Sequence, residues 1–285
     1  MQEMLSSSIK VKKGNNYFQE TLNIIIDDSW SLKLEYTDTI IMIPARLGSS
    51  RLPNKPLLKI NGIPLIIHAY NCAKNAKLNA PVVVATDDKL IFKTVSEYGG
   101  TALMTSHQHE SGSDRILEAL EKFDHEKKYK NIIHLQGDLP NISGNLIKKL
   151  AQVAKDPLKE ITTVIVKASP DEFDDPSVVK VATTFTNNNP KVNDVGRALY
   201  FSRACIPTGS ENIWHHIGIY AWRRDILEKF VKLKPSPLEK SEKLEQLRAL
   251  ESGMQIHTII TSEHPIGVDT KSDLKKAENY FKDLI

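Results

Sequence analysis

The segment from residue 44 to residue 57, PARLGSSRLPNKPL, combines the residue types that a loop needs to hold a polyanion. Three cationic side chains, Arg46, Arg51 and Lys55, fall within ten residues. The glycine and serines between them let the backbone approach a ligand closely, and the prolines stiffen the loop because they fix φ. A loop of this kind at the carboxyl end of a strand suits a triphosphate. The alternative is a solvated basic turn, and the spacing is not that of a Walker A motif.

Two aspartates form a second group with chemical potential. Asp138 ends a predicted strand, and Asp269 lies near the end of the last strand pattern. In open α/β sheets, ligands bind beyond the carboxyl ends of the strands, so these carboxylates could hold Mg²⁺ against phosphate oxygens. Spacing alone favours the simpler alternative, in which each aspartate caps a helix. Asp87 and Asp88, at the end of another predicted strand, are interpreted as turn and cap residues.

The elements that must position these groups follow an alternating pattern from residue 39 onward. Aliphatic runs predict strands, and amphipathic runs between them predict helices. Strands are expected at 39–45, 81–88 and 131–138, and helices at 64–76, 90–100, 113–123 and 144–156. This alternation indicates an α/β fold with a mostly parallel central sheet and helices on both faces.

The middle of the chain has a different pattern, with strands and few helices. Strands are expected at 161–169, 177–185, 198–204 and 216–222, as a smaller mixed or antiparallel portion that closes over the first half. A helix at 237–251 follows, and Ser236 and Glu239 form a capping box at its start. A strand at 254–261 and a strand end running into a helix at 267–281 complete the pattern.

The bulk composition excludes several classes of protein. A net charge of +3 is too small for general nucleic-acid binding, and no apolar run is long enough to span a membrane. Two cysteines, Cys72 and Cys205, argue against a disulfide framework and fit a cytoplasmic location. Residues 1–38 stand apart from the domain expected at 39–285. They suggest a small hairpin with a strand at 29–36, or a mis-assigned start codon.

The phosphate loop belongs to a longer series of motifs. INGIPLIIHAY, VATDD, ESGSDR, LQGD, ALYFSRACIP, HIGIYAWR, SPLEKSEKLEQLRALESG and GVDTKSDL follow it in order. From about residue 39 to the C-terminus, the chain resembles the cytidylyltransferases that activate 3-deoxy-manno-octulosonate (KDO). The resemblance implies a Rossmann-like nucleotidyltransferase fold, CTP and KDO as substrates, and Mg²⁺ as cofactor. It also implies a homodimer that uses the central β region, and a product that enters lipopolysaccharide synthesis.

The resemblance further implies roles for individual residues. Arg46, Lys55 and Asp138 are expected to be catalytic, and Asp138 and Asp269 to bind the metal. The nucleotide is expected to contact Ala45, Arg46, Arg51, Lys55, Ser111 and Arg115. The acid sugar is expected to contact Gln136, Arg203, His216, Tyr220, Glu245 and Gln246. A bidentate Arg203 would suit the sugar's carboxylate, and the polar side chains would suit its hydroxyls.

One position departs from the family pattern. The family usually has QGDEP, whereas this chain has QGDLP, with Leu139 in place of the glutamate. An 8-amino KDO analogue or a sialic acid therefore stays open as the sugar. A non-catalytic sensor of the nucleotide or sugar would be expected to lack a loop cation or an aspartate, and all are present. A sugar-1-phosphate nucleotidyltransferase would typically have a more glycine-rich GGxGTR-like loop.

Overall fold

The computed structural model describes residues 9–13, 16–20, 36–48 and 52–283. By its internal contacts the chain divides into two compact units, Met1–Tyr36 and Thr37–Ile285. In the first unit, β1 (Ile9–Lys13) and β2 (Asn16–Glu20) pair antiparallel. The strand expected at 29–36 lies outside the described residues except for Tyr36, so the hairpin predicted there stays a prediction.

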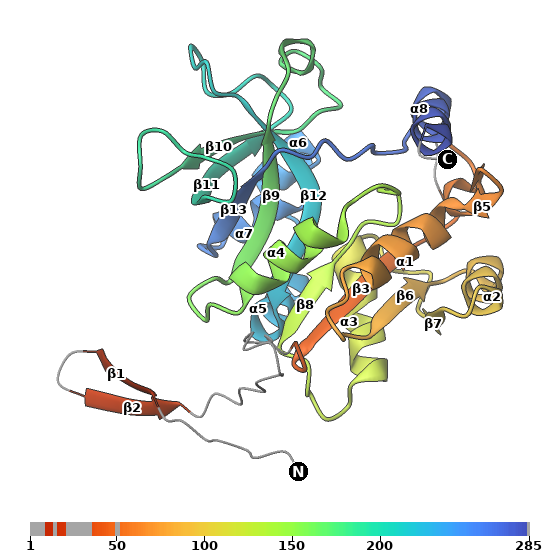
Figure 1. The fold of residues 1–285 in the computed structure, drawn as a ribbon, viewed down its shortest axis with the longest axis horizontal. Coiled ribbons are helices and arrows are strands. Elements are labelled where there is room, and N and C mark those ends of the chain that lie inside the picture. Colours follow the sequence, from red (N-terminus) through yellow and green to blue (C-terminus); the bar gives the residue numbers. More distant parts are fainter. Residues whose placement is uncertain (1–8, 14–15, 21–35, 49–51, 284–285) are drawn as a thin grey trace. The chain divides into compact units, whose positions relative to one another are not determined.

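The second unit is built on one nine-stranded sheet with the order β10-β11-β13-β9-β12-β8-β3-β6-β7 (Figure 1). Its parallel half follows the expected alternation of strands and helices. This half contains β3 (Thr39–Ala45), β6 (Val82–Thr86), β7 (Thr101–Met104) and β8 (Asn131–His134). All three pairings within it are parallel, and β3 lies between β8 and β6. The strand at 39–45 has the predicted bounds.

The other half of the sheet differs from the prediction, which was a separate β portion that closes over the first half. The observed half contains β9 (Ile161–Lys167), β10 (Lys180–Thr184), β11 (Val195–Ser202), β12 (Trp214–Arg223) and β13 (Ile256–Thr261). The long strand β12 pairs antiparallel with both β8 and β9, so this half continues the same sheet. Only β13 and β9 pair in parallel within it. The sheet is therefore mixed as a whole.

Helices cover both faces of the sheet, as predicted (Figure 1). One face carries α1 (Leu65–Asn75) and α4 (Gly144–Ala154), which contact each other. The opposite face carries α3 (Gly112–Phe123) and α5 (Arg224–Val231), which also contact each other. Near the last parallel strand, α2 (Lys89–Glu97) packs on β6 and β7, and Asp88 caps it as expected. The chain ends with α8 (Lys271–Lys282).

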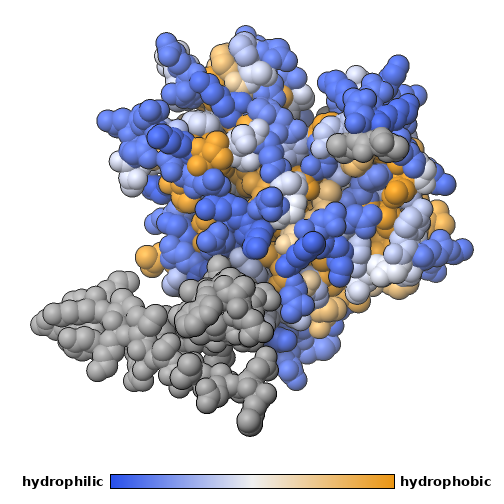
Figure 2. All heavy atoms as spheres, viewed as in Figure 1, coloured by the Kyte–Doolittle hydropathy of each residue, from blue (hydrophilic) through white to orange (hydrophobic). Residues whose placement is uncertain are grey.

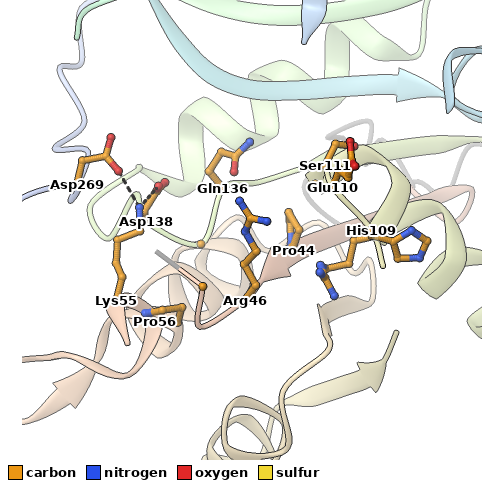
Figure 3. A pocket seen from close by; sticks show the side chains of 15 residues that line it. Pro44, Arg46, Lys55, Pro56, His109, Glu110, Ser111, Gln136, Asp138 and Asp269 are labelled. Carbon is orange, nitrogen blue, oxygen red and sulfur yellow. Dashed lines mark hydrogen bonds and ion pairs between the residues drawn. The ribbon is translucent and has the colours of Figure 1, made fainter. Parts of the chain in front are cut away.

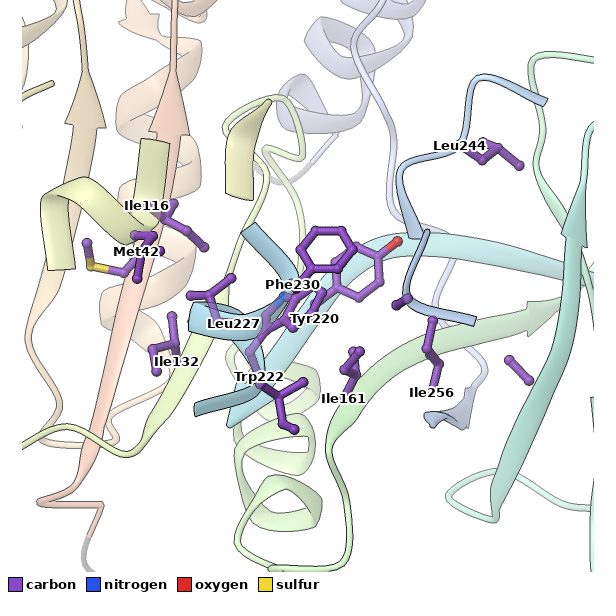
Figure 4. Close-up of a cluster of buried hydrophobic side chains, with 14 of the residues drawn as sticks. Met42, Ile116, Ile132, Ile161, Tyr220, Trp222, Leu227, Phe230, Leu244 and Ile256 are labelled. Atoms are coloured by element: carbon purple, nitrogen blue, oxygen red, sulfur yellow. The ribbon is translucent and has the colours of Figure 1, made fainter. Parts of the chain in front are cut away.

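The main hydrophobic core lies under α3 and α5 (Figure 4). Ile40 and Met42 of β3 reach it because alternate strand residues point to the same face. Across the sheet, Trp222 of β12 packs on Phe230 of α5 with ring centroids 4.9 Å apart. Ile116 of α3 joins the same cluster. This core fixes α3 beside β3, which matters because β3 ends and α3 begins at the site described below.

The prediction of one continuous helix at 237–251 is wrong. The segment consists of α6 (Pro237–Glu242) and α7 (Gln246–Glu251). The capping box of Ser236 and Glu239 is confirmed at the start of α6. Lys243 then adopts a left-handed conformation, with φ 57° and ψ 47°, which ends the first helix. The break turns Leu244 and Glu245 inward, and Leu244 joins the core.

Several local features differ from the sequence pattern. β7 and α5 were not expected, and the strand expected at 131–138 stops at His134, so that residues 135–138 leave the sheet as a loop. Asp269 does not follow a strand directly, because β13 ends at Thr261 and residues 262–269 contain no strand. Cys72 and Cys205 are unpaired. Among the described residues, no helix has the length and apolar character needed to cross a bilayer. On the face shown in Figure 2, apolar residues are interspersed among polar ones.

Candidate active site

A cavity of about 350 Å³ opens at the carboxyl end of β3, beside the loop that follows β8. It brings together the phosphate loop, the two aspartates and the start of α3, which are far apart in the sequence. The residues that line it are Pro44, Ala45, Arg46, Gly48, Lys55, Pro56, His109, Glu110, Ser111, Gly112, Arg115, Gln136, Gly137, Asp138 and Asp269. In Figure 3, Lys55 and the aspartates lie at one end, residues 109–111 at the other, and Arg46 and Gln136 between them. This elongated arrangement suits an extended polar ligand.

The phosphate loop begins where β3 ends at Ala45. Arg46 and Lys55 both line the cavity, as expected for cations that bind phosphate. Gly48 also lines it, and an added Cβ there would meet nothing within 4 Å. A short 3₁₀ helix, η1 (Lys55–Leu57), begins at Lys55. Arg51 lies outside the described residues, so its role stays a prediction.

Lys55 joins the two aspartates. Its Nζ atom lies 2.7 Å from Oδ2 of Asp138 and 2.8 Å from Oδ1 of Asp269. Burial alone would lower the pKa of Lys55, but the two carboxylates outweigh it and raise that pKa. The ammonium group is therefore charged at neutral pH. The aspartates converge as predicted, although loops and not strand ends carry them.

The donor set fits a divalent cation. Two carboxylate oxygens face one cationic atom, and Mg²⁺ is usually held by one or two carboxylates together with substrate phosphates and waters. Within the described part of the chain, no group of three or more His, Cys, Asp or Glu side chains could hold a metal ion by itself. A metal held by Asp138 and Asp269 would therefore need oxygen ligands from a bound substrate or from water.

The start of α3 forms the opposite end of the cavity. The hydroxyl of Ser111 accepts a hydrogen bond from the backbone N–H of Asp114 at 3.1 Å and caps the helix. His109 and Glu110 also line the cavity, although neither was expected as a site residue. Glu110 is the first residue of the ESGSDR motif and His109 directly precedes it, and this position is the signal that could have identified them.

Glu118 holds His109 in place. Its carboxylate contacts Nε2 of His109, the ammonium group of Lys122 and the backbone N–H of Ser106. Burial alone would raise the pKa of Glu118, but these hydrogen bonds lower it to about 2. The carboxylate is therefore ionised at neutral pH and orients the imidazole at the cavity wall.

Arg115 forms an ion pair and hydrogen bonds within the protein. Its guanidinium group pairs with Asp87 at 3.0 Å and donates to Oγ1 of Thr105 at 2.8 Å, and its side chain is only 3% exposed. Asp87, interpreted as a simple turn residue, therefore also anchors this arginine. Arg115 still borders the cavity, so a contact with the nucleotide stays a prediction.

The residues expected to bind the sugar do not all lie together. Gln136 lines the cavity, whereas Arg203, His216, Tyr220, Glu245 and Gln246 do not. Arg203 instead donates to the backbone oxygens of Glu242 at 2.9 Å and Pro176 at 2.8 Å. Its guanidinium group thus ties the end of β11 to α6.

The other expected sugar residues are buried behind the cavity wall. His216 contacts Oγ1 of Thr163 at 2.9 Å, and its ring lies 5.5 Å from that of Tyr220. Burial lowers the pKa of His216 to about 3 and raises that of Tyr220, so both are neutral. Glu245 accepts a hydrogen bond from Ser113 at 3.2 Å, and Gln246 is buried next to it in the sequence. Ser113 follows Gly112, so this group borders the cavity through α3.

His134 connects the cavity to this group, although it was not expected as a site residue. Its Nε2 lies 3.4 Å from the amide nitrogen of Gln136, and its ring centroid lies 6.1 Å from that of Tyr220. Burial lowers the pKa of His134 to about 4, so the ring is neutral and can accept from the amide. Leu139 is also buried and does not line the cavity.

The fold and the site together define an α/β nucleotidyltransferase, in which the basic loop after β3 faces the acidic pair of Asp138 and Asp269. The chain belongs to the cytidylyltransferase family, whose model matches residues 40–256. A protein of Brucella ovis named 3-deoxy-manno-octulosonate cytidylyltransferase is 48% identical, covering 87% of this chain and 97% of that protein. The protein of the same name from Brucella anthropi is 47% identical, covering 86% and 96%.

A solved structure agrees with this assignment. The structure of CMP:2-keto-3-deoxy-manno-octonic acid synthetase complexed with CTP is 38% identical and has a TM-score of 0.78. It covers 87% of this chain and 100% of its own. A cytidylyltransferase from Leptospira borgpetersenii, at 15% identity and a TM-score of 0.57, shares the fold.

Proposed function

We propose that the protein transfers CMP from CTP to the anomeric hydroxyl of KDO and releases pyrophosphate. The observation that carries this proposal is the convergence of Arg46, Lys55, Asp138 and Asp269 on one cavity. The similar proteins named above support the choice of CTP and KDO. The elongated cavity supports a nucleoside at the end formed by residues 109–111 and phosphates at the end formed by Lys55.

The chain's own residues act mainly by position and charge. Arg46 and Lys55, joined by Arg51, bind the triphosphate and stabilise the charge that spreads over its oxygens in the transition state. Asp138 and Asp269 would hold Mg²⁺, which when bound neutralises phosphate charge and orients the phosphate oxygens. The anomeric hydroxyl of the sugar attacks the α-phosphorus in line, and pyrophosphate leaves. A single displacement inverts the configuration at phosphorus.

The sugar is proposed to lie beside Gln136. The neutral His134 accepts a hydrogen bond from the Gln136 amide and so directs its oxygen towards the sugar hydroxyls. His216, Tyr220, Glu245 and Gln246 form the polar wall behind this position. Arg203 is proposed to pair with the sugar's carboxylate. Because Leu139 is buried away from the cavity, its replacement of the family's glutamate is a weak reason to favour another sugar.

Pyrophosphate release with Mg²⁺ tests the proposal directly. CTP, UTP, ATP and GTP are crossed with KDO, 8-amino-KDO, sialic acid and glucose-1-phosphate. Release is expected only with CTP and KDO, and Asp138→Asn and Arg46→Gln are expected to lower it at least about a hundredfold. Asp174→Asn and Arg197→Gln make the same charge changes at exposed positions and should leave it unchanged. Release with another acid sugar would retain the chemistry and change the substrate, whereas CTP binding without release would indicate a sensor.

The wider setting of the reaction is also a proposal. The protein is proposed to act as a cytoplasmic homodimer that supplies CMP-KDO for lipopolysaccharide synthesis. The catalytic domain is proposed to comprise residues 39–285, with residues 1–38 as an extension. A variant that begins at Tyr36 should keep its activity and thermal stability if the extension is dispensable.

A further inference from the structure

Lys55 occupies the place between two carboxylates where a cation would be bound. Its ammonium group is within 2.8 Å of both Asp138 and Asp269, and its side chain is only 15% exposed. Removing the cationic side chain would leave two carboxylates facing one another. Lys55 is thus a counter-ion of the acidic pair in the nucleotide-free protein.

An ammonium group and a divalent metal ion cannot share this position. Mg²⁺ binds carboxylate oxygens at about 2.1 Å, shorter than the contacts that Lys55 makes with the same oxygens. The two cations would also repel each other strongly at such a separation. A metal can therefore bind both aspartates only after Nζ of Lys55 has moved away.

Nucleotide phosphates provide the alternative partner that Lys55 would need. A triphosphate brings several anionic oxygens into the cavity that Lys55 lines, and a lysine side chain has the freedom to turn towards them. We propose that Lys55 closes the acidic pair to divalent cations until nucleotide phosphates draw its ammonium group away. This inference rests on the proposed function, because it takes Asp138 and Asp269 as metal ligands.

The proposal differs from a role for Lys55 in phosphate binding alone. If Lys55 only bound phosphate, its replacement would weaken nucleotide binding and leave the affinity of the nucleotide-free protein for metal unchanged. If Lys55 also closes the acidic pair, its replacement must increase that affinity. A binding measurement without nucleotide therefore separates the two roles.

Mn²⁺ binding to the nucleotide-free protein, followed by electron paramagnetic resonance, makes this measurement. The wild type is compared with Lys55→Gln, Lys55→Ala and the matched control Lys59→Gln, in which an exposed lysine nearby loses the same charge. Both Lys55 variants should bind Mn²⁺ at least about tenfold more tightly than the wild type, because a cation no longer opposes the metal. Lys59→Gln should bind Mn²⁺ as the wild type does. Thermal melts identify the variants that are folded.

A second measurement separates this inference from the metal site itself. The water-proton relaxation of Mn²⁺·CTP is compared between the wild type and Asp138→Asn, and an enhancement that the variant loses would support the metal site. If that enhancement is lost but the Lys55 variants bind Mn²⁺ no more tightly than the wild type, the inference about Lys55 is overturned alone. If Asp138→Asn enhances relaxation as the wild type does, both the proposed metal site and the inference about Lys55 are contradicted.

Discussion

The backbone N–H of Val268 donates a hydrogen bond to the carbonyl oxygen of Asp138 at 3.0 Å. This bond joins the loop after β8 to the segment before α8, and each of these segments carries one aspartate of the acidic pair. The side chain of Val268 is fully buried with Leu52, Ile60, Leu65 and Ala277. Since Leu52 belongs to the phosphate loop, one small core supports both the loop and the second aspartate.

Shortening the side chain of Val268 should therefore affect stability and activity together. Val268→Ala removes buried methyl groups and is expected to lower the free energy of unfolding by about 1–3 kcal/mol. Because Asp269 is the next residue, kcat should fall severalfold more than the fraction of folded protein does. Urea unfolding and pyrophosphate release measure the two effects. Val192→Ala, at an exposed position, is the control, and an unchanged kcat in folded Val268→Ala would contradict the coupling.

The acidic pair also shows what the sequence could and could not predict. Both aspartates were selected from their positions after strands and from the resemblance, and the structure brings them together. Lys55 was expected to be catalytic and to bind the nucleotide, but not to pair with the aspartates, because sequence spacing does not show that residues so far apart in the chain form an ion pair. The contact depends on a loop hydrogen bond at Val268, which has no sequence signature.

Elsewhere, the sequence pattern did not reveal the partners of polar side chains within the protein. Arg115 and Arg203 are expected to contact ligands because arginine suits anions. The structure also gives them partners within the protein, Asp87 for Arg115 and two backbone oxygens for Arg203, and their ligand contacts stay predictions. Strand periodicity predicted most of the sheet, whereas the break at Lys243 came from a left-handed residue that the helical pattern does not reveal. The long strand β12 extended the sheet because it pairs on both sides.

Arg115 and Asp87 provide a test of buried ion pairing. Arg115→Met leaves the carboxylate of Asp87 without its partner at a partly buried position, so the free energy of unfolding should fall by about 3 kcal/mol. In contrast, Lys93→Met breaks the exposed pair with Glu97 and should cost less than about 0.5 kcal/mol. Chemical denaturation of both variants checks the difference. Equal losses would show that Arg115 is not anchored by this pair.

Glu245 should make stability depend on pH. Burial raises the pKa of Glu245, although hydrogen bonds from the hydroxyls of Ser111 and Ser113 lower it. The folded state therefore holds the carboxyl proton of Glu245 more tightly than the unfolded state does. The stability that Glu245 contributes is then present below the unfolded pKa, about 4.3, and is lost as the pH rises through the folded value. Glu245→Gln cannot ionise, so it should become more stable relative to the wild type as the pH increases.

Urea unfolding at pH 5 and pH 8 measures this effect. The difference in unfolding free energy between Glu245→Gln and the wild type should favour the variant more at the higher pH. Glu211→Gln, at an exposed position, should show the same difference at both. A difference that does not change with pH in Glu245→Gln would mean that the folded state does not hold this proton.

Gly112 should control how α3 meets the sugar side of the cavity. A Cβ at Gly112 would lie 3.2 Å from Nε2 of His134 and 3.2 Å from Cγ of Pro44, which is tighter than ordinary packing. Gly112→Ala must therefore displace the His134 ring that contacts Gln136, at a cost of about 1–3 kcal/mol. Since Gln136 is proposed to contact the sugar, the KM for KDO should rise about three- to tenfold.

Two further variants make this last prediction specific. Gly218→Ala places a Cβ no closer than 4.0 Å to Gln136, so it should leave the KM for KDO unchanged. Adding His134→Ala to Gly112→Ala removes the ring that the new methyl group meets. If the clash with His134 is the cause, the two changes must be non-additive in stability, because each alters the same contact. Strictly additive losses of unfolding free energy would mean that Gly112→Ala acts through its contact with Pro44. They would contradict a role for His134 in connecting α3 to the sugar.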